Sequence, residues 1–558
     1  MLIDCAQPGH PERLDTDVAI LGSGPAGIAL ALALADHGIA FVLVEAGGMD
    51  FDKAGQEFYR ASLIEPESHG PVHLYRRRAF GGTSAVWGGR CIPYDPIDFE
   101  DRAWIPNAAW PIAHEEIAAY YPRALDICRA GPAAFTAAEA LPDTPGGMID
   151  DVPSADVILD RLERFSEPTH FGKAYREKLA AAPNATLLTG ATATALVTEN
   201  AGARCTGADL HTATGGTIAL RARRTIVATG GLETPRLLLA SNADRPAGLG
   251  NERDLVGRFY QAHLEGEIGT LAFHKPAKDV RLDYQRSPEG IYCRRYIWLS
   301  PEAQRREHLS GLIARPAHAS IVDPAHRDPV LSAMYLVKDF ILPEYARKLT
   351  STERRVKAAF GGGTSKLIAA HIGNLVRHPF KLAGFSIDWG RRRVLATRKL
   401  PSVVLRDPRN AYPLDINAEQ SPNRDSRVYL SNERDPHGVP RLSIDWRMTS
   451  DDRDRVARGM RVLQAAFATS SNATLDLHEL DEQVAEITRI GGHHIGTARM
   501  AASPQDGVID GNCETFETRD LFVAGAAAFP TSSFANPTLT IIALSLRLAD
   551  HLAATATR

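Results

Sequence analysis

Three glycines near the N-terminus have the types and spacing needed to hold a dinucleotide. Residues 22–27 read Gly-Ser-Gly-Pro-Ala-Gly, a G-x-G-x-x-G pattern. Gly22 allows a tight turn, Gly24 lets the backbone approach a pyrophosphate, and Gly27 allows a helix to pack closely on a strand. Glu45 follows, and an acidic side chain there can bind the hydroxyls of a ribose with a free 2′-OH. The pattern therefore predicts a site for FAD or NAD rather than NADP.

The elements around this pattern are those that a dinucleotide site requires. Residues 18–21 are a continuous apolar run, typical of a buried strand, and an Ala/Leu-rich helix follows to about residue 37. A second apolar strand, 41–44, leads into Glu45. Because the helix begins at the glycine turn, its N-terminus is expected to face the phosphates. This complete strand-turn-helix-strand order makes a weak glycine pattern specific.

Several later segments read as elements of the same fold. A short apolar strand at 225–228 runs into a glycine turn and a helix that begins at Gly230. A further apolar strand, 521–524, and a helix at about 537–553 lie near the C-terminus. Between these segments, residues 428–446 read as a hairpin of an antiparallel sheet. The nucleotide-binding fold is therefore expected to be interrupted by insertions and resumed.

A second set of informative residues lies near the C-terminus. Residues 491–500 read Gly-Gly-His-His-Ile-Gly-Thr-Ala-Arg-Met, and Asn536-Pro537-Thr538 precedes the last helix. The pattern His-x-x-Gly-Thr-x-Arg-Met with a later Asn-Pro-Thr resembles the glucose-methanol-choline (GMC) oxidoreductases, and among them the pyranose oxidase-like branch. Gly81-Gly82-Thr83-Ser84 and Gln420-Ser421-Pro422-Asn423 match in the same order.

This resemblance implies FAD as the cofactor and suggests the catalytic residues. The family's histidine before Gly-Thr faces the flavin ring and matches His493, and its second catalytic position matches Asn536. Oxidation of an alcohol needs a base for the hydroxyl proton while hydride leaves carbon for flavin N5, and a neutral imidazole suits the first task. Asn536 can donate a hydrogen bond to the developing alkoxide. His494 lies one position out of register and is the weaker candidate.

The resemblance also implies a set of residues around the flavin and the substrate. The expected cofactor-binding residues are Gly22, Gly24, Gly27, Glu45, Gly82, Thr83, Ser84, Trp87, Val197, Gly230, Gly525, Ala526, Pro537 and Thr538. Gln420 and His494 are candidates for contact with the substrate. Members that attach FAD covalently carry a histidine beside the Trp of the glycine loop. Val86 occupies that position here, so we expect noncovalent FAD.

The matching segments group into two expected domains, and the fold class is α/β, α+β overall. Residues 1–100, 185–262 and 486–558 are expected to form a Rossmann-like FAD-binding domain assembled from discontinuous segments. Residues 101–184 and 263–485 are expected to form a substrate-binding or cap domain with an antiparallel sheet and helices. Residues 113–129 read as one of its helices.

Composition argues against several other classes of protein. The chain has 558 residues and a net charge of −4, which gives no electrostatic reason to expect a nucleic-acid partner. Its six cysteines include no C-x-x-C pair, so we expect isolated thiols and no metal site. No apolar run is long enough for a transmembrane segment. The N-terminal residues lack a secretory signal pattern, which leads us to expect a cytoplasmic protein.

One basic segment has no evident role. Residues 364–399 are amphipathic and carry Arg377, Lys381, Arg391, Arg392, Arg393, Arg398 and Lys399. Such a segment could contact a membrane surface or a partner subunit. It could also be a solvated insertion over the active site or at an oligomer contact. The sequence leaves these alternatives, and the oligomeric state, open.

Together, these features predict FAD-dependent oxidation of an alcohol to a carbonyl, with His493 as the base. The expected substrate is a secondary hydroxyl of a sugar, glycoside or polyol, and the electron acceptor is dioxygen or a compound still to be identified. An NAD(P)H-dependent flavin reductase or monooxygenase is the alternative, but it would need a second nicotinamide site. A non-enzymatic binding protein on a flavoprotein fold would have no use for the pair His493 and Asn536.

Overall fold

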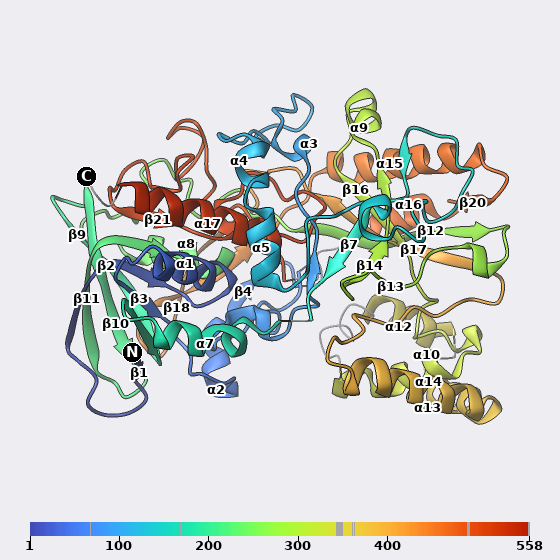
Figure 1. The fold of residues 1–558 in the computed structure, drawn as a ribbon, viewed down its shortest axis with the longest axis horizontal. Coiled ribbons are helices and arrows are strands. Elements are labelled where there is room, and N and C mark those ends of the chain that lie inside the picture. The colour runs from blue at the N-terminus through green and yellow to red at the C-terminus, as the bar shows by residue number, and fades with distance from the viewer. Residues whose placement is uncertain are drawn as a thin grey trace.

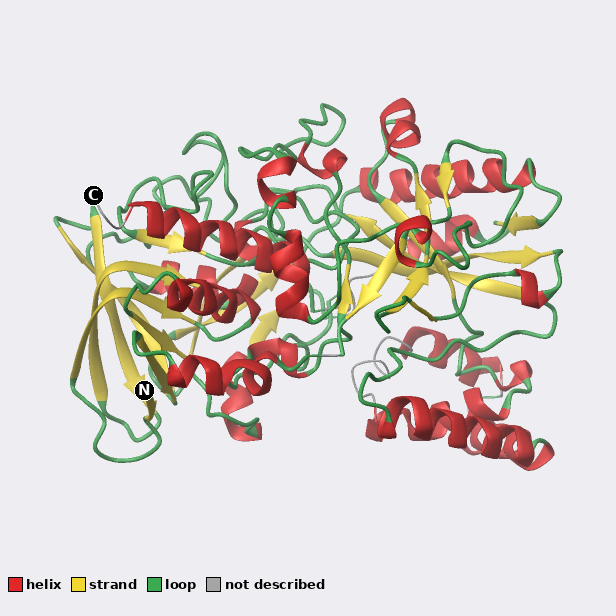
Figure 2. Cartoon of the chain, viewed as in Figure 1, coloured by secondary structure: helices red, strands yellow, loops and turns green. Residues whose placement is uncertain are grey.

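The computed structural model describes residues 1–66, 69–167, 169–341, 350–359, 361, 363–487 and 492–555. Figure 1 shows a sheet flanked by helices on the left and a second sheet with its own helices on the right. A group of helices lies below the second sheet (Figure 2). Both expected kinds of architecture, α/β and antiparallel β with helices, are therefore present, and the predicted fold class is confirmed.

The large sheet contains eight strands and is built from three distant parts of the chain. Its order is β1 (Leu2–Asp4), β8 (Ala185–Thr189), β3 (Phe41–Val44), β2 (Arg13–Leu21), β11 (Thr217–Val227), β10 (Arg204–Thr212) and β9 (Ala191–Glu199), and β21 (Leu521–Val523) also pairs with β11. The pairs from β1 to β11 and the pair β11–β21 are parallel, whereas β10 pairs antiparallel with β9 and β11. The interrupted nucleotide fold expected from the sequence is what forms.

Helix α1 (Pro25–Asp36), which packs on this sheet, is apolar on nearly every side. Its residues from Ala26 to Leu34 are all buried. The helix packs against α17 (Thr538–Thr555) and α7 (Phe171–Ala181). Such an all-apolar helix is stable only inside a large core. The expected βαβ unit is thus β2, α1 and β3, and α8 (Gly230–Ala240) follows β11 in the same way.

The second sheet is antiparallel and has one apolar and one polar face. Its order is β20 (Ala473–Asp476), β12 (His263–Phe273), β17 (Ala411–Glu419), β16 (Leu312–Pro316), β15 (Ile297–Leu299) and β6 (Val157–Ile158). Leu264 and Ile416 belong to the same buried cluster as Met460 of α15 (Ser450–Ala468). On the other face, His263 lies opposite Glu419 and Glu265 lies opposite Asn417. Alternation along β12 therefore turns His263 away from the apolar core.

Two smaller sheets join segments from both expected domains. One contains β13 (Gln285–Arg286), β14 (Tyr292–Arg295), β7 (Leu162–Phe165) and β5 (Arg90–Cys91). The other contains the predicted hairpin, β18 (Arg427–Arg434) and β19 (Pro440–Asp445), together with β4 (Ala61–Leu63). Because β4 and β5 come from residues 1–100, these sheets tie the two halves together. The division at 1–100, 185–262 and 486–558 against 101–184 and 263–485 remains our proposal.

The remaining helices are mostly short. Residues 113–129 form two helices rather than the single helix expected, α4 (His114–Ala118) and α5 (Tyr121–Cys128). Pro122 lies in the first turn of α5, where a proline is tolerated because that turn needs no N–H donor, whereas a continuous helix would need it. The others are α2 (Lys53–Gln56), α3 (Pro96–Phe99), α6 (Ala137–Ala140), α9 (Pro301–Glu307) and α16 (Leu480–Ala485).

A separate helical group contains the basic segment. It comprises α10 (Pro329–Ile341), α12 (Thr350–Ala359), α13 (Thr364–Arg377), α14 (Pro379–Trp389) and the π-helical turn η5 (Gly390–Leu395). Ile321, Leu331, Tyr335 and Leu367 form its small core. All six cysteines are buried and unpaired, in agreement with the expectation of isolated thiols. Within the described ranges, no helix combines the length and apolar character needed to cross a bilayer.

Candidate active site

The glycine turn between β2 and α1 has the geometry that each glycine predicts. Gly22 has φ +107°, and a Cβ there would lie 2.5 Å from the carbonyl oxygen of Ala228. A Cβ on Gly27 would lie 1.9 Å from the carbonyl oxygen of Gly22, so helix and turn are in direct contact. A Cβ on Gly24 would meet nothing within 4 Å. The turn is therefore tightly packed at Gly22 and Gly27 and open at Gly24. This open side lies at the N-terminus of α1, where a pyrophosphate fits.

Glu45 is held at the end of β3 by short hydrogen bonds. Its Oε2 accepts from the hydroxyl of Ser23 at 2.6 Å, and its Oε1 accepts from the backbone N–H of Gly47 at 2.8 Å. The side chain is buried and lines the cavity described next. Oε2 also accepts from the backbone N–H of Ser23 at 3.4 Å, whereas Oε1 can accept a second hydrogen bond, so this fixed carboxylate can still bind a ribose hydroxyl.

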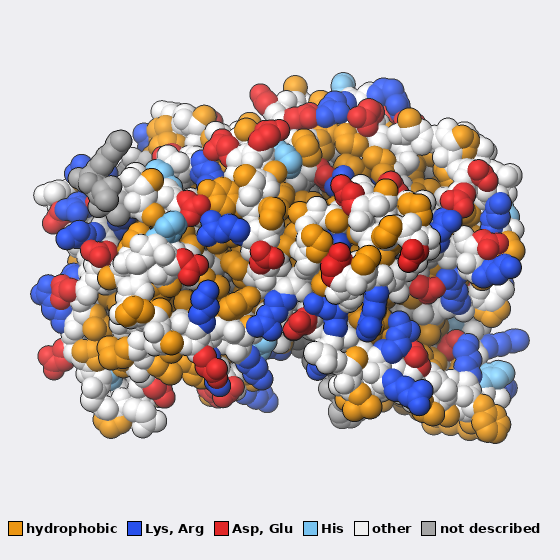
Figure 3. Space-filling view, viewed as in Figure 1, with side chains coloured by type: hydrophobic (Ala, Val, Ile, Leu, Met, Phe, Trp, Pro, Cys, Tyr) orange, Lys and Arg blue, Asp and Glu red, His pale blue; other side chains and the backbone are white. Residues whose placement is uncertain are grey.

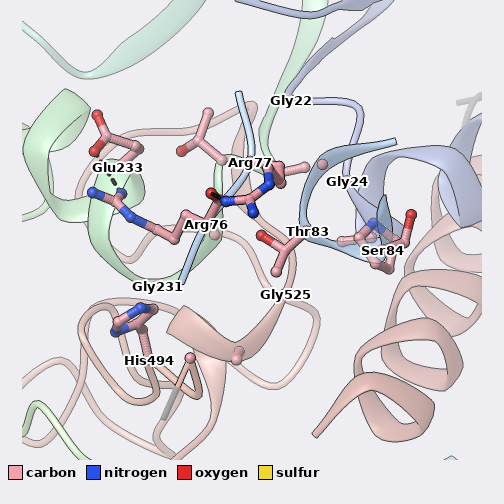
Figure 4. A pocket seen from close by; sticks show the side chains of 18 of the residues that line it. Gly22, Gly24, Arg76, Arg77, Thr83, Ser84, Gly231, Glu233, His494 and Gly525 are labelled. Atoms are coloured by element: carbon pink, nitrogen blue, oxygen red, sulfur yellow. Dashed lines mark hydrogen bonds and ion pairs between the residues drawn. The ribbon is translucent and has the colours of Figure 1, made fainter. Parts of the chain in front are cut away.

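One cavity of about 950 Å³ joins the glycine turn to His493 and Asn536. Its walls include segments 82–84, 191–193, 228–231 and 524–526. Figure 4 shows Thr83 and Ser84 on a loop beside Gly24, with Gly525 below them and His494 beneath Gly231. The volume is at the upper end of the range for cofactor sites. A glycine cradle, a fixed carboxylate and this volume together fit FAD.

Most of the predicted site residues line this cavity. They are Gly22, Gly24, Glu45, Gly82, Thr83, Ser84, Trp87, Gly230, His493, His494, Gly525, Ala526, Asn536, Pro537 and Thr538. Gly491, which begins the predicted histidine motif, lies outside the described residues. Trp87 also has a packing role, since its indole N–H donates to the carbonyl oxygen of Thr169 at 2.8 Å.

Three predicted residues do not line the cavity. Gly27 acts only through its contact with Gly22. Val197 lies further along β9 than residues 191–193, which form the wall. Gln420 is buried behind the site, where its Oε1 accepts from the N–H of Ala262 at 3.0 Å and from the indole of Trp446 at 2.9 Å. The structure therefore gives Gln420 a supporting position rather than the contact with substrate that we expected.

His493 lies between two polar side chains from different parts of the fold. Its Nε2 is 3.2 Å from Nδ2 of Asn536, and its Nδ1 is 3.0 Å from Nδ1 of His263. The rings of His263 and His493 meet edge to face, with centroids 4.7 Å apart. His493 and Asn536 come from the C-terminal part of the chain, whereas His263 is the first residue of β12. The sequence did not single out His263, because no motif surrounds it.

The partners of His263 determine where the protons lie. Its Nε2 is 3.1 Å from the carbonyl oxygen of Ser532, which can only accept, so Nε2 carries the hydrogen. Burial lowers the pKa of His263 to about 4, so its ring is neutral near pH 7 and Nδ1 is an acceptor. His493 must then donate from Nδ1. Its Nε2 is left with a lone pair, and Asn536 donates to that atom.

His494 lies in a different network. Its Nδ1 is 2.8 Å from the hydroxyl of Tyr260, which is 3.0 Å from Nε2 of His69. A Cβ on Gly231 would lie 2.0 Å from the carbonyl oxygen of His494, so the backbone here packs directly on the start of α8. These contacts suit a residue that shapes the cavity wall.

The sequence interpretation also missed a charged wall of the cavity. Arg76 donates to Glu233 at 2.7 Å, and Glu233 also accepts from Arg236 at 3.0 Å (Figure 4 shows the first pair). Although burial opposes ionisation, Arg236 and Arg76 together hold the pKa of Glu233 below its usual value. Arg236 reaches Asp435 as well, at 2.6 Å. The run Arg76-Arg77-Arg78 just before the glycine loop was a signal that could have identified this wall.

Comparison with known proteins gives matches over nearly the whole chain. Residues 17–334 match the family described as FAD dependent oxidoreductase, and residues 422–545 match the family described as GMC oxidoreductase. The 2-methyl-1,2-propanediol dehydrogenase of Mycolicibacterium austroafricanum is 23% identical over 602 residues, covering 96% of this chain and 95% of the relative. The paromamine 6'-oxidase of Streptomyces fradiae is 24% identical over 601 residues, covering 98% and 94%.

A solved structure supports the fold independently. The crystal structure of pyridoxine 4-oxidase from Mesorbium loti superposes with a TM-score of 0.52 at 17% identity, covering 96% of this chain and 99% of its own. At this level of identity the similarity shows a shared fold. Among the described residues, no group of His, Cys, Asp and Glu side chains is arranged to hold a metal ion.

Proposed function

Since the chain belongs to the FAD-dependent oxidoreductases and carries the C-terminal domain of the GMC family, we propose that it oxidises an alcohol in its cavity, with His493 and Asn536 binding the alcohol oxygen. The protein binds FAD. In our proposal, the glycine turn of residues 22–27 holds the pyrophosphate and Glu45 holds the ribose. The cavity that runs from this turn to His493 is the observation that supports the assignment most strongly.

The attachment of FAD is proposed to be noncovalent. Val86 lines the cavity where a linking histidine would stand, and a valine side chain has no nucleophile. Acid precipitation of the purified protein should therefore release yellow FAD into the supernatant. Flavin that stays with the precipitate would overturn the noncovalent assignment.

In this proposal, different residues accept the proton of the substrate hydroxyl, hydrogen-bond to its oxygen and position the base. The substrate hydroxyl gives its proton to Nε2 of His493, the ring atom that the hydrogen bond from Nδ1 leaves with a lone pair. In the structure the amide N–H of Asn536 donates to Nε2 of His493; with substrate bound it would donate to the substrate oxygen instead, which frees the Nε2 lone pair and stabilises the negative charge that develops on the oxygen. FAD, when bound, supplies the acceptor for the hydride that leaves carbon. His263 keeps His493 in the required tautomer and continues to accept its Nδ1–H once the ring is protonated.

The proposed substrate is a sugar, glycoside or polyol that is oxidised at a secondary hydroxyl. Two long relatives are named for 2-methyl-1,2-propanediol and for paromamine, compounds with more than one hydroxyl, which supports a hydroxylated substrate; the secondary position rests on the family resemblance alone. The cavity is also lined by Arg90, Tyr284 and Ser402, side chains that can hydrogen-bond to hydroxyl groups. These contacts favour a polar substrate over an aliphatic alcohol.

An anaerobic substrate panel tests this proposal. Mixing the holoenzyme with sugars, glycosides and polyols should bleach the flavin absorbance without NAD(P)H. His493→Ala should slow the bleaching by about a hundredfold or more while FAD content is unchanged. Bleaching by NADPH alone would favour the flavin reductase or monooxygenase instead. Readmission of dioxygen to the reduced protein would then show whether dioxygen is the electron acceptor.

A further inference from the structure

Exposed apolar side chains gather on one small part of the molecule. Of the thirteen large apolar side chains that are exposed in the described part of the chain, seven lie between residues 368 and 395. They are Ile368, Ile372, Val376, Phe380, Ile387, Val394 and Leu395. Phe380, in the first turn of α14, is 91% exposed. Single exposed apolar residues are ordinary, whereas a cluster of this kind marks an interaction surface.

The cluster is not the core-facing side of these helices. On α13, the buried residues Leu367, His371 and Asn374 face the small core of the helical group. Ile368, Ile372 and Val376 recur every fourth residue and therefore form a separate stripe along the exposed side. The helix thus buries one side in the helical group and leaves an apolar stripe exposed on another.

Positive charge surrounds this stripe. Residues 364–399 contain eight Lys and Arg residues and one acidic residue, Asp388, in a chain whose net charge is −4. Asp388 is itself paired with Arg392 at 3.3 Å. Figure 3 shows Lys and Arg side chains beside hydrophobic ones over the helices at the lower right. We call residues 364–399 the basic apolar surface.

We propose that the basic apolar surface binds the face of an anionic lipid bilayer. Exposed apolar residues can enter the boundary between headgroups and acyl chains, while Lys and Arg contact anionic headgroups. A second copy of this chain would fit worse, because a symmetric contact would bring two strongly positive surfaces together. The association is interfacial, since no described helix is long and apolar enough to span the bilayer.

The basic apolar surface is continuous with the wall of the cavity. Leu400 follows it directly and packs in one buried cluster with Phe165 and Tyr284. The next two residues, Pro401 and Ser402, line the cavity itself. A membrane bound at the basic apolar surface would therefore contact a segment that leads, within three residues, to the wall of the cavity. The proposal does not depend on the chemistry assigned to His493.

Vesicle co-sedimentation of the holoenzyme tests the proposal. Vesicles of phosphatidylcholine with phosphatidylglycerol should bind the wild type at least about tenfold more tightly than vesicles of phosphatidylcholine alone. Salt at 1 M, where the screening length is about 3 Å, should weaken the binding. Two double variants, Phe380→Ser with Leu395→Ser and Arg391→Glu with Arg392→Glu, should each bind at least about tenfold more weakly.

Matched controls separate a membrane surface from general changes in charge or polarity. Ile64→Ser and Arg223→Glu replace exposed residues elsewhere and should bind as the wild type does. FAD content and melting temperature confirm that each variant is folded. Equal binding to both kinds of vesicle, or unchanged binding by both double variants, overturns the proposal. So does a dimer that these variants convert to a monomer without any vesicle binding, which would identify a second copy as the occupant.

Discussion

The Nδ1 atoms of His263 and His493 lie 3.0 Å apart, so one ring must donate and the other must accept. The carbonyl oxygen of Ser532 makes the choice, because it requires the hydrogen of His263 to be on Nε2. A backbone carbonyl thus decides which nitrogen of His493 can act as a base. His263 acts through His493 and is a positioning residue.

Loss of the acceptor on His263 should alter both the rate and the pH dependence of oxidation. His263→Leu removes the partner that stabilises protonated His493, so we expect kcat to fall about tenfold to a hundredfold. The apparent pKa of the base in kcat/KM should move to lower pH by about one unit, the value of one hydrogen bond to a charged group. Stopped-flow reduction across pH measures both quantities.

The conservative replacement supplies the control for this prediction. In His263→Asn, the side-chain oxygen can accept from His493 and the amide can donate to Ser532. We expect this variant to recover most of the rate and a pH profile like that of the wild type. A profile that is identical in the Leu and wild-type proteins would contradict the positioning role, even if the rate were lower.

Asn536 should contribute to the transition state more than to substrate binding. Asn536→Ala removes a donor that faces Nε2 of His493, and we expect kcat to fall about a hundredfold with a smaller change in KM. Asn536→Asp should be comparably slow, because an ionised carboxylate cannot donate. A change of less than threefold in both variants would remove Asn536 from the mechanism. FAD absorbance in each purified variant serves as the control for cofactor binding.

Two glycines of the same turn should respond differently to alanine. Gly24→Ala adds a Cβ that meets nothing in the protein but faces the cavity, so we expect FAD to bind about tenfold more weakly with apoprotein stability unchanged. Gly22→Ala should lower both the affinity for FAD and the stability of the apoprotein, since its Cβ would lie 2.5 Å from a backbone oxygen and φ is +107°. FAD titration and melting of the apoprotein distinguish the two, and Gly48→Ala, whose nearest atom is 3.8 Å away, is the control.

A buried ion pair beside the site makes a strong stability prediction. Arg102 and Glu419 are fully buried and joined by two hydrogen bonds of 2.7 and 2.6 Å. Arg102→Met leaves the carboxylate unpaired and should cost about 3–5 kcal/mol, seen as a lower melting temperature. Adding Glu419→Gln removes that charge and should restore most of the loss. The exposed pair Arg13 and Asp15 is the comparison, and Arg13→Met should leave the melting temperature unchanged because solvent screens that pair.

Acid should destabilise the fold through His263. Its pKa is lowered from 6.5 to about 4, so the unfolded chain binds the proton first as the pH falls. Stability should therefore decrease between about pH 6.5 and pH 4, by about 3 kcal/mol for this group. Urea unfolding across that window should show a smaller decrease in His263→Asn. An equal decrease in both proteins would show that His263 titrates normally.

The sequence predicted the parts of the site that local rules determine. Gly22, Gly24 and Gly27 are constrained by one turn and one helix, so their spacing together with the surrounding strand-turn-helix-strand order predicted the cradle. His493 and Asn536 were predicted from motifs that lie next to them in the chain. His263 could not be found in this way, because its partners are 230 and 269 residues away and no motif marks it. Gln420 was misjudged because a motif does not reveal which side of a loop is buried.

Secondary structure shows the same distinction. Strands 41–44 and 521–523 were predicted within a residue because they are continuous apolar runs that are fully buried. The helix expected at 113–129 divides into α4 and α5 near Pro122, since tertiary contacts rather than propensity determine where a short helix ends. The pairing of β4 with β19 joins residues far apart in the chain, and no local pattern predicts it.

The hydrogen-bonded row from Ser532 through His263 to His493 begins and ends in the C-terminal segment and passes through the antiparallel sheet at His263. A shift of less than an ångström between β12 and that segment would break the Nδ1 contact while leaving the glycine cradle intact. Mild heat or denaturant should therefore abolish turnover before the protein loses its bound FAD. The rate of oxidation thus reports the relative position of β12 and the C-terminal segment, because His493 can act as a base only while its contact with His263 is intact.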